Sequence, residues 1–439
     1  MSDPDAQLYL RHIESRRQHT DQILSELGYD ALLIHSGRSE MRFLDDHSPP
    51  FRANAPFVAW VPQPFAEDSL LEIRIGQRPR LWFCQPDDFW HVPPDPPAGW
   101  WSEQFDIRIC RSSEDWQDCF GRERAFAVIG RRSDLESVLG TGDLNPEALL
   151  QRLHESRTRK TEWECQCIEE ANRIGVSAHL AAANCFDAGG SELEIHLAYL
   201  AAAGLDQDHL PYNSIVGLNE HAAVLHYQHR QSGAPESRHS FLIDAGAHCH
   251  GYASDITRTW AADGSSEFAD LIKAMDQAQQ RLADQARVGN SFVDLHHETQ
   301  LAVAGILEQA DIVKMSPQSM VESGVSGYFM PHGLGHFLGV QVHDVAGLLS
   351  SEGKPLAPPE QYPALRLTRV LESGNVVTIE PGLYFIPTLL ERLKASPEGR
   401  FVDWSRVESF KPFGGIRIED NVRVTEDAPV NFTRAAWPE

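Results

Sequence analysis

The 439-residue sequence lacks several features that define large classes of protein. It has no run of 18 apolar residues, so we expect no membrane span. Its first residues, MSDPDAQLYLRHIESRR, include no apolar stretch of the kind that a signal peptide requires. Basic residues are few, because 38 Lys and Arg stand against 63 Asp and Glu, and the formal charge is -25. This charge disfavours nucleic acid and anionic membranes as partners, and we expect a cytoplasmic protein.

Cysteine is also sparse, with seven residues in the chain. The number is odd, and the only close pair, Cys165 and Cys167, has one residue between its members. Zinc and redox motifs usually have two residues between their cysteines. We therefore predict reduced thiols, as is usual in the cytosol.

The length and the hydrophobic content of 42% predict two domains with real cores, which we place at residues 1–158 and 159–439. The first begins with a charged segment of helical periodicity and continues with short apolar runs typical of strands. These runs are ALLIHSG, FVAWVP, RLWFCQ, FDIRIC and AFAVIG. The alternation of helical and strand-like segments predicts an α/β domain.

The second domain is expected to begin with two capped helices. Thr161 and Glu164 form one capping-box pattern, and Ser191 and Glu194 form another. The segments SFLIDAG and ASDITRTW predict a strand pair, and two further helices are expected at about 266–286 and 292–310. Residues 325–425 are rich in glycine and are predicted as strand and loop. This order favours an α+β domain with helices packed on one curved sheet.

Four carboxylates stand where a strand would ordinarily be apolar. They are Asp244 in FLIDAG, Asp255 in ASDITRTW, Glu380 in VVTIEPG and Glu419 in GGIRIEDNV. Alternation places Glu419 and Arg417 on one face of a strand, opposite the neighbouring isoleucines. Each acid alone is better explained by a turn or a strand end. If the four are gathered in an apolar interior, they require a cation.

Histidines are concentrated in one short stretch. PHGLGHFLG, residues 331–339, contains His332 and His336, and His343 follows. The glycines between them make a regular helix improbable. Four carboxylates and one imidazole do not fit a tetrahedral structural zinc site, but they can hold two divalent ions. The oxygen-rich set favours harder ions such as Mn²⁺, with Co²⁺ or Zn²⁺ as alternatives. If His336 is the ligand, the other two histidines are free to act on substrate.

The order of these segments resembles the metal-dependent pita-bread peptidases, which include methionine aminopeptidases, Xaa-Pro aminopeptidases and prolidases. Further segments, YDALLIHSG, FLDDHSPPFRANAPFVAW, LNEHAAVLHY, GVQVHDVAG and KPFGGIRIEDN, are similar to the bacterial Xaa-Pro dipeptidase branch. That branch includes enzymes named organophosphorus acid anhydrolases. The resemblance implies an α/β N-terminal domain followed by an α+β pita-bread catalytic domain.

The resemblance also implies residue roles. The metal ligands would be Asp244, Asp255, His336, Glu380 and Glu419, with Asp255 and Glu419 bridging two ions. The catalytic residues would be Glu380, His343 and His332, and the substrate-binding residues would be Tyr212, His226, Arg366, Arg417 and Asp45. Arg366 would bind the proline carboxylate, and Asp45 would reach the neighbouring subunit's site in a homodimer.

The resemblance implies hydrolysis of dipeptides that end in a trans-prolyl residue, with a possible side activity on organophosphorus esters. An aminopeptidase for longer Xaa-Pro peptides would share all five ligands. Arg366 and the proline-rich loop at Trp90 favour the dipeptidase. A non-catalytic binding module is disfavoured, since such modules typically lack the ligand set.

Overall fold

A computed structural model of the chain describes residues 3–112, 115–116, 125–135 and 142–438. The chain divides into two compact units. One consists of Met1–Arg157 with Thr161–Glu164, and the other of Thr158–Lys160 with Cys165–Glu439. Within the described ranges, no helix combines the length and the apolar character needed to cross a bilayer.

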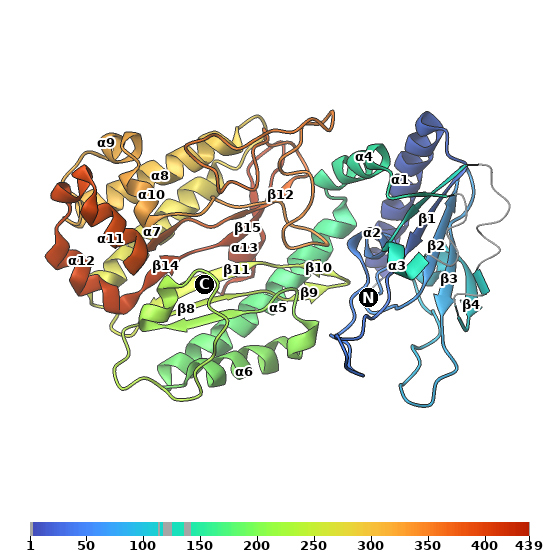
Figure 1. Cartoon of the computed structure of the whole chain (residues 1–439), viewed down its shortest axis with the longest axis horizontal. Helices are drawn as coiled ribbons and strands as arrows, with labels where there is room; N and C mark the ends of the chain where they lie inside the picture. Colours follow the sequence, from blue (N-terminus) through green and yellow to red (C-terminus); the bar gives the residue numbers. More distant parts are fainter. Residues whose placement is uncertain (1–2, 113–114, 117–124, 136–141, 439) are drawn as a thin grey trace. The chain divides into compact units, whose positions relative to one another are not determined.

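The first unit contains a mixed sheet with helices beside it (Figure 1). Its described strands have the order β4-β3-β2-β1-β5-β6, with β1 parallel to β5 and antiparallel to β2. The strands are β1 (Ala31–His35), β2 (Leu70–Arg74), β3 (Arg80–Cys84), β4 (Asp106–Cys110), β5 (Phe126–Ile129) and β6 (Asp143–Leu144). The helices are α1 (Asp3–Leu27), α2 (Ala55–Val58), α3 (Arg132–Leu135) and α4 (Glu147–Thr158). The predicted α/β class of this part is confirmed.

The strand predicted for FVAWVP is wrong, because helix α2 covers its first two residues and the remainder is turn and bend. The Asn54 side chain accepts a hydrogen bond from the backbone N–H of Phe57 at 3.1 Å, which caps the helix, and Pro56 lies in its first turn. Five consecutive apolar residues from Phe57 to Val61 are all buried. A fully buried run has no alternation, so its hydrophobicity does not distinguish a strand from a helical turn.

Two of the long helices begin where their capping residues predict. The Thr161 backbone N–H donates to the Glu164 carboxylate at 2.8 Å, and the reciprocal bond is 3.4 Å long. Ser191 and Glu194 form the second capping box. The long helices are α5 (Glu162–Asp187), α6 (Glu192–Ala203), α7 (Glu267–Asp284) and α8 (Phe292–Gln309).

The strands of the second unit form several small sheets in the described residues, so the expected single curved sheet is wrong. The predicted pair, β8 (Ser240–Ala245) and β11 (Ile256–Ala261), is antiparallel and continues into β7 (Ile215–Leu218). A second sheet contains β12 (Val376–Ile379), β15 (Asp420–Arg423) and β16 (Val430–Asn431). A third pairs β13 (Gly382–Tyr384) with β14 (Gly415–Arg417), and a fourth pairs β9 (His248–Cys249) with β10 (Tyr252–Ala253). A bridge between Thr257 and Glu419 connects β11 to the link between β14 and β15.

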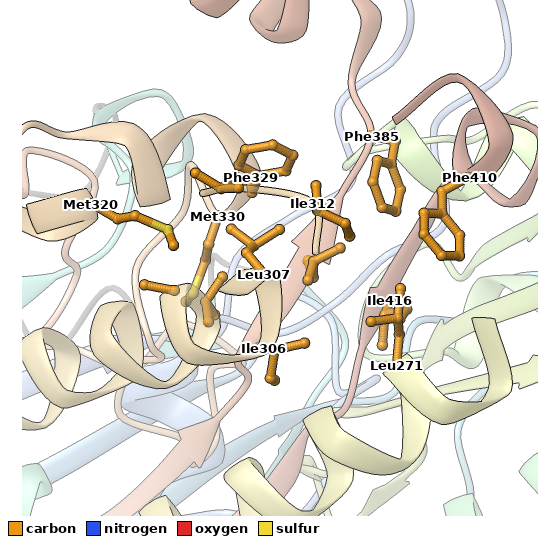
Figure 2. Packing of buried hydrophobic residues seen from close by; sticks show 14 of the residues in the cluster. Leu271, Ile306, Leu307, Ile312, Met320, Phe329, Met330, Phe385, Phe410 and Ile416 are labelled. Carbon is orange, nitrogen blue, oxygen red and sulfur yellow. The ribbon is translucent and has the colours of Figure 1, made fainter. Parts of the chain in front are cut away.

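Helices cover these strands on two sides, with α5 and α6 (green) on one and α7 and α8 (yellow) on the other (Figure 1). On the first side, residues of α5 and α6 form one cluster with β7 and β8. On the second, residues of α7 and α8 pack with β13, β14 and the segment after α8. Figure 2 shows part of this second cluster, in which Leu307 and Met330 lie among aliphatic and aromatic side chains. Both clusters pack against the central strands, and the acids lie in these strands or next to strand ends.

The prediction of only strand and loop for residues 325–425 is wrong at three helices. They are α10 (Val325–Phe329), α11 (Pro387–Ala395) and α12 (Trp404–Phe410). In α11 a proline occupies the first turn, and the buried Leu390 and Leu393 have helical spacing. Asp403 caps α12. Two further short helices are α9 (Pro317–Glu322) and α13 (Phe432–Ala436).

Candidate active site

A cavity of about 220 Å³ in the second unit gathers most of the predicted site residues. Its lining residues are Leu225, His226, Asp244, Asp255, Pro331, His332, Gly333, Gly335, His336, His343, Ala364, Arg366, Glu380, Arg417 and Glu419. Of the residues predicted from sequence, only Tyr212 and Asp45 are not in this lining. The cavity therefore joins segments that are far apart in the chain.

The centre of the cavity has the geometry of a cation site. Asp255, His336 and Glu419 are buried, and each offers a ligand atom within 4.8 Å of the others. The His336 Nε2 atom lies 3.4 Å from an Asp255 oxygen and 3.8 Å from a Glu380 oxygen. The His336 Nδ1 atom bonds the Phe337 carbonyl at 2.9 Å, which turns Nε2 toward the carboxylates.

The acids at the rim of this centre are held by hydrogen bonds. The Tyr212 hydroxyl donates to one oxygen of Asp244 at 2.8 Å, and Arg417 donates to the other at 2.6 Å. The Thr257 hydroxyl donates to Glu419 at 2.6 Å. Tyr212 therefore belongs to the site through Asp244, although it does not line the cavity.

Burial and mutual repulsion shift the titration of these acids. Burial, with the negative charges of Asp255, Glu380 and Asp244, raises the pKa of Glu419 well above its usual value. Burial also raises the pKa of Glu380 to about 7. Burial acts in the same direction on Asp255, but its hydrogen bonds to His336 and Tyr212, together with the charges of His336 and His343, outweigh burial and lower the pKa of that carboxyl. The cavity thus concentrates more negative charge than the protein itself neutralises, and its oxygen-rich donor set fits hard divalent cations.

The glycines of PHGLGHFLG allow its backbone to approach its neighbours closely. A Cβ atom on Gly335 would lie 2.1 Å from the Thr378 carbonyl oxygen, and one on Gly333 would lie 3.0 Å from the Ala364 carbonyl oxygen. The Thr378 backbone N–H donates to the His336 carbonyl at 2.9 Å. The expectation that this segment is not a regular helix is confirmed, and the close approach places His336 beside β12.

The alternation predicted around Glu419 is present. Ile416 and Ile418 belong to the hydrophobic cluster of Figure 2, while Arg417 and Glu419 line the cavity. The next residue, Asp420, is fully buried. Its carboxylate accepts hydrogen bonds from Arg258 at 2.6 Å and from Arg434 at 2.8 Å.

The next residue along the chain, Asn421, holds the backbone of Asp255 in place. Its side-chain oxygen accepts the backbone N–H of Asp255 at 3.0 Å. This bond fixes the chain at the point where Asp255 enters the cavity.

Two residues that sequence reasoning missed connect the site. Tyr384 accepts a hydrogen bond from Arg417 at 2.8 Å, and its hydroxyl lies 2.9 Å from His332 Nε2. Thr257 accepts a bond from Arg417 Nε at 3.1 Å, in addition to donating to Glu419. Thr257 could have been found, because the predicted strand ASDITRTW places it two positions after Asp255, and alternation would put both on one face. Tyr384 carried no comparable signal.

His332 has both ring nitrogens occupied. Its Nδ1 lies 2.8 Å from the Gly333 carbonyl and must donate to it, so Nε2 accepts from the Tyr384 hydroxyl. Burial, with the charge of Arg417 close by, lowers the pKa of His332 to about 3. The imidazole is therefore neutral and fixed in one orientation.

Arg366 lies in a loop, so the strand predicted around it is wrong. The predicted alternation of faces nevertheless holds, because Leu365 and Leu367 are buried and Arg366 is exposed and lines the cavity. His343 also lines the cavity, and the centroid of its ring lies 4.3 Å from that of the His336 ring. Burial, with the charges of His336 and Arg366, lowers the pKa of His343 to about 4.

Asp45 belongs to the first unit, in an exposed group with Asp46 and His47. Its carboxylate lies 3.3 Å from His47 Nδ1. The expectation that Asp45 reaches a neighbouring subunit stays a prediction.

A buried ion pair fixes the loop that carries His343. Lys160 Nζ lies 3.0 Å from the Asp344 carboxylate, and both side chains are almost fully buried. The Asp344 backbone N–H donates to the Phe337 carbonyl at 2.9 Å. The pair therefore joins the His336 and His343 segments to the start of the unit.

We expect Lys160→Met to destabilise the protein by about 3–5 kcal/mol, because it removes one partner of a buried ion pair. Chemical denaturation measures the change. The matched control is Arg173→Met, which removes a cation from the exposed pair with Glu170 and should cost about 0–1 kcal/mol. Equal losses in the two variants would contradict the role of burial.

Comparison with known proteins is consistent with this arrangement. Residues 166–426 match the model of metallopeptidase family M24, and residues 7–154 match that of the Xaa-Pro dipeptidase N-terminal domain. The chain belongs to metallopeptidase family M24. As in the prediction from sequence, the M24 match covers the unit that contains the cavity.

Relatives of this M24 chain include proteins named Xaa-Pro dipeptidase. That of Aeromonas hydrophila is 45% identical over 435 residues, covering 98% of this chain and 99% of the relative. That of Xanthomonas campestris is 46% identical over 433 residues, covering 98% of both chains.

Solved structures similar to this M24 chain include zinc-substituted aminopeptidase P of Escherichia coli, with a TM-score of 0.73 and 21% identity. That match covers 100% of this chain and 96% of the other. Aminopeptidase PepP of Pseudomonas aeruginosa has a TM-score of 0.73 at 20% identity, covering 99% and 96%. The predicted pita-bread fold after an α/β domain is confirmed.

Proposed function

We propose that this chain is a Xaa-Pro dipeptidase that hydrolyses the amide bond before a C-terminal trans-proline. The observation that carries the proposal is the cavity in which four carboxylates and His336 lie together and Arg366 stands on the wall. The full-length similarity to proteins named Xaa-Pro dipeptidase supports it. We propose a cytoplasmic location, in keeping with the acidic composition.

Two divalent ions fit the donor set, and we propose Mn²⁺, with Co²⁺ or Zn²⁺ as alternatives. The residues that would hold them are Asp244, Asp255, His336, Glu380 and Glu419. When bound, such ions supply a Lewis acid and acidify water for attack on an amide. The carboxylates would balance their charge, which relieves the repulsion seen among the buried acids.

The other residues of the cavity bind and orient the dipeptide. Arg366 can grip the terminal carboxylate with two parallel hydrogen bonds, which leaves no room for a further residue. His343, neutral because its pKa is low, can donate an N–H to the scissile carbonyl oxygen. The leaving nitrogen of proline must be protonated to depart, and we assign Glu380 to carry that proton.

The remaining predicted residues contact substrate or hold Asp244 in place. Both ring nitrogens of His332 are occupied, so His332 cannot donate a hydrogen bond to substrate without losing an existing one. We therefore propose that its ring positions the substrate by contact. His226 lines the same cavity and is assigned to substrate contact. Arg417 and Tyr212 hold Asp244 from two directions.

The proposal predicts that Ala-Pro is hydrolysed and that Ala-Pro-Ala is not, because the longer peptide has no carboxylate where Arg366 stands. Kinetics on both peptides, with metal analysis of the same sample, test this directly. Faster cleavage of Ala-Pro-Ala would favour the aminopeptidase alternative. Activity on neither peptide in a sample that contains metal would favour a binding module.

We further propose a side activity on organophosphorus esters. A tetrahedral phosphorus centre resembles the tetrahedral species formed during amide hydrolysis, so the same groups can stabilise both. We expect a fluorophosphonate to be hydrolysed faster by the metal-loaded protein than by a metal-stripped sample, measured as fluoride release. Equal rates in the two samples would reject this activity.

We also propose a homodimer. The segment that carries Asp45 exposes large apolar side chains, since Phe43 and Leu44 are each 91% exposed. Trp90, in the proline-rich loop of the same unit, is also exposed. Apolar surface of this kind is typical of contact regions. Analytical ultracentrifugation tests the assembly, and a monomer at micromolar concentration would reject it.

A further inference from the structure

A pair of cysteines, Cys167 and Cys249, lies in the second unit and is not part of the cavity lining. Cys249 is at the end of β9, directly across from Tyr252 of β10. The tip of this hairpin is formed by His250 and Gly251, both with positive φ. Cys249 is partly exposed, Cys167 on α5 is buried, and neither is in a disulfide.

One face of helix α5 rests against this hairpin. Cys167, Ala171 and Gly175 are four residues apart and share that face. The Ser254 hydroxyl donates to the Ala171 carbonyl at 3.0 Å. A Cβ atom on Gly175 would lie 3.0 Å from that same hydroxyl oxygen. The helix face and the chain that follows Cys249 are therefore packed tightly together.

At the Cys167 end of this face the two thiols meet. Cys167 forms a hydrogen bond with Cys249, and His250 forms another. These contacts lower the pKa of Cys249 below that of an ordinary thiol, although burial opposes them. Cys185, which is also partly exposed, has its pKa raised by burial and by Glu194. Thiolate character at a partly exposed sulfur next to a second thiol is the usual setting of an oxidation-sensitive cysteine.

We propose that Cys249 is a peroxide-sensitive thiol and that Cys167 is the thiol that resolves it. In the first step the Cys249 thiolate attacks one peroxide oxygen, the O–O bond breaks, and a sulfenic acid and hydroxide form. In the second step the Cys167 sulfur loses its proton and attacks the Cys249 sulfur. The S–O bond breaks, water leaves and a disulfide remains. Both thiols are oxidised and the peroxide is reduced to water.

The bridge would tie helix α5 to the hairpin that leads into Asp255. The disulfide would therefore constrain chain segments that lie behind the cavity, and it would not involve the lining residues directly. The proposal does not depend on which substrate the cavity accepts.

The test is peptide mapping of the metal-loaded protein after treatment with hydrogen peroxide and alkylation of the remaining thiols. We expect a disulfide between Cys167 and Cys249 that dithiothreitol reverses. Before oxidation, iodoacetamide at neutral pH should alkylate Cys249 about tenfold faster than Cys185, because the thiolate is the nucleophile. Alkylation of Cys249 at or below the rate of Cys185, with no bridge after peroxide, would overturn the proposal.

Two variants separate the roles of the thiols. In Cys167→Ser the resolving thiol is absent, so peroxide should leave a sulfenic acid on Cys249 that dimedone traps. In the matched control Cys185→Ser, the disulfide should form as in the unaltered protein. A bridge from Cys249 to Cys165, which is two residues from Cys167 on α5, would show that the assigned resolving thiol is wrong.

Discussion

Replacement of Asp255 by Asn, or of Glu419 by Gln, is expected to abolish dipeptide hydrolysis and to reduce the bound metal. Each substitution removes one negative charge from a centre in which Asp255, Glu419 and His336 converge. Metal ions contribute several kcal/mol of charge stabilisation to such reactions. A loss of about 4 kcal/mol corresponds to about 10³-fold in rate. Kinetics and elemental analysis of the purified variants measure the two effects.

The fold should survive these substitutions, because the amides keep the shape of the acids and relieve repulsion in the metal-free chain. Circular dichroism and thermal unfolding check this. Asp427→Asn is the matched control, since the same change on the exposed Asp427 should alter neither metal content nor rate. Full activity with one tightly bound ion per unaltered chain would reject the two-ion proposal. Retention of both ions and full rate in Asp255→Asn would remove Asp255 from the ligand set.

Replacement of Arg366 by Ala is expected to lower kcat/KM for Xaa-Pro dipeptides by about ten- to a hundred-fold. This corresponds to a charge-assisted contact of roughly 1.5–3 kcal/mol. The reason is geometric, because a planar guanidinium binds a carboxylate through two parallel bonds that Lys cannot reproduce. Arg366 stands on the cavity wall, in a loop with buried leucines on both sides, so it is held in place without being enclosed.

The decisive comparison for Arg366 is between a dipeptide and its amide. Xaa-Pro-amide has no carboxylate, so Arg366→Ala should affect it little. Equal losses on both substrates would show that Arg366 acts through structure and not through the carboxylate. Arg392→Ala, which removes an exposed arginine from helix α11, should leave both rates unchanged.

The parts of the molecule that sequence reasoning predicted are those with a local signal. Polar residues inserted in apolar runs predicted the strand that contains Asp244 and the strands beside which Asp255 and Glu419 lie, because side chains alternate between the faces of a strand. The start of α5 was predictable because Thr161 and Glu164 bond to each other within one turn.

What the sequence did not reveal depends on partners far along the chain. No local pattern indicates the pairing of Lys160 with Asp344, the bond that Tyr384 accepts from Arg417, or the bond between Tyr384 and His332. The run FVAWVP was misjudged for another reason. It is buried on all sides, so its hydrophobicity carried no period.

The chain from Ile416 to Asn421 has a consequence for how this protein can change in evolution. Successive residues there face the hydrophobic cluster, the cavity and a buried ion pair in turn. A single inserted or deleted residue would exchange these environments all at once, placing an isoleucine where Glu419 stands and a carboxylate in the apolar core. A point substitution in this segment alters one of these environments, whereas a change of its length alters all of them together. Variation in length among functional descendants should therefore be confined to other parts of the chain, such as the exposed turn around Asp427.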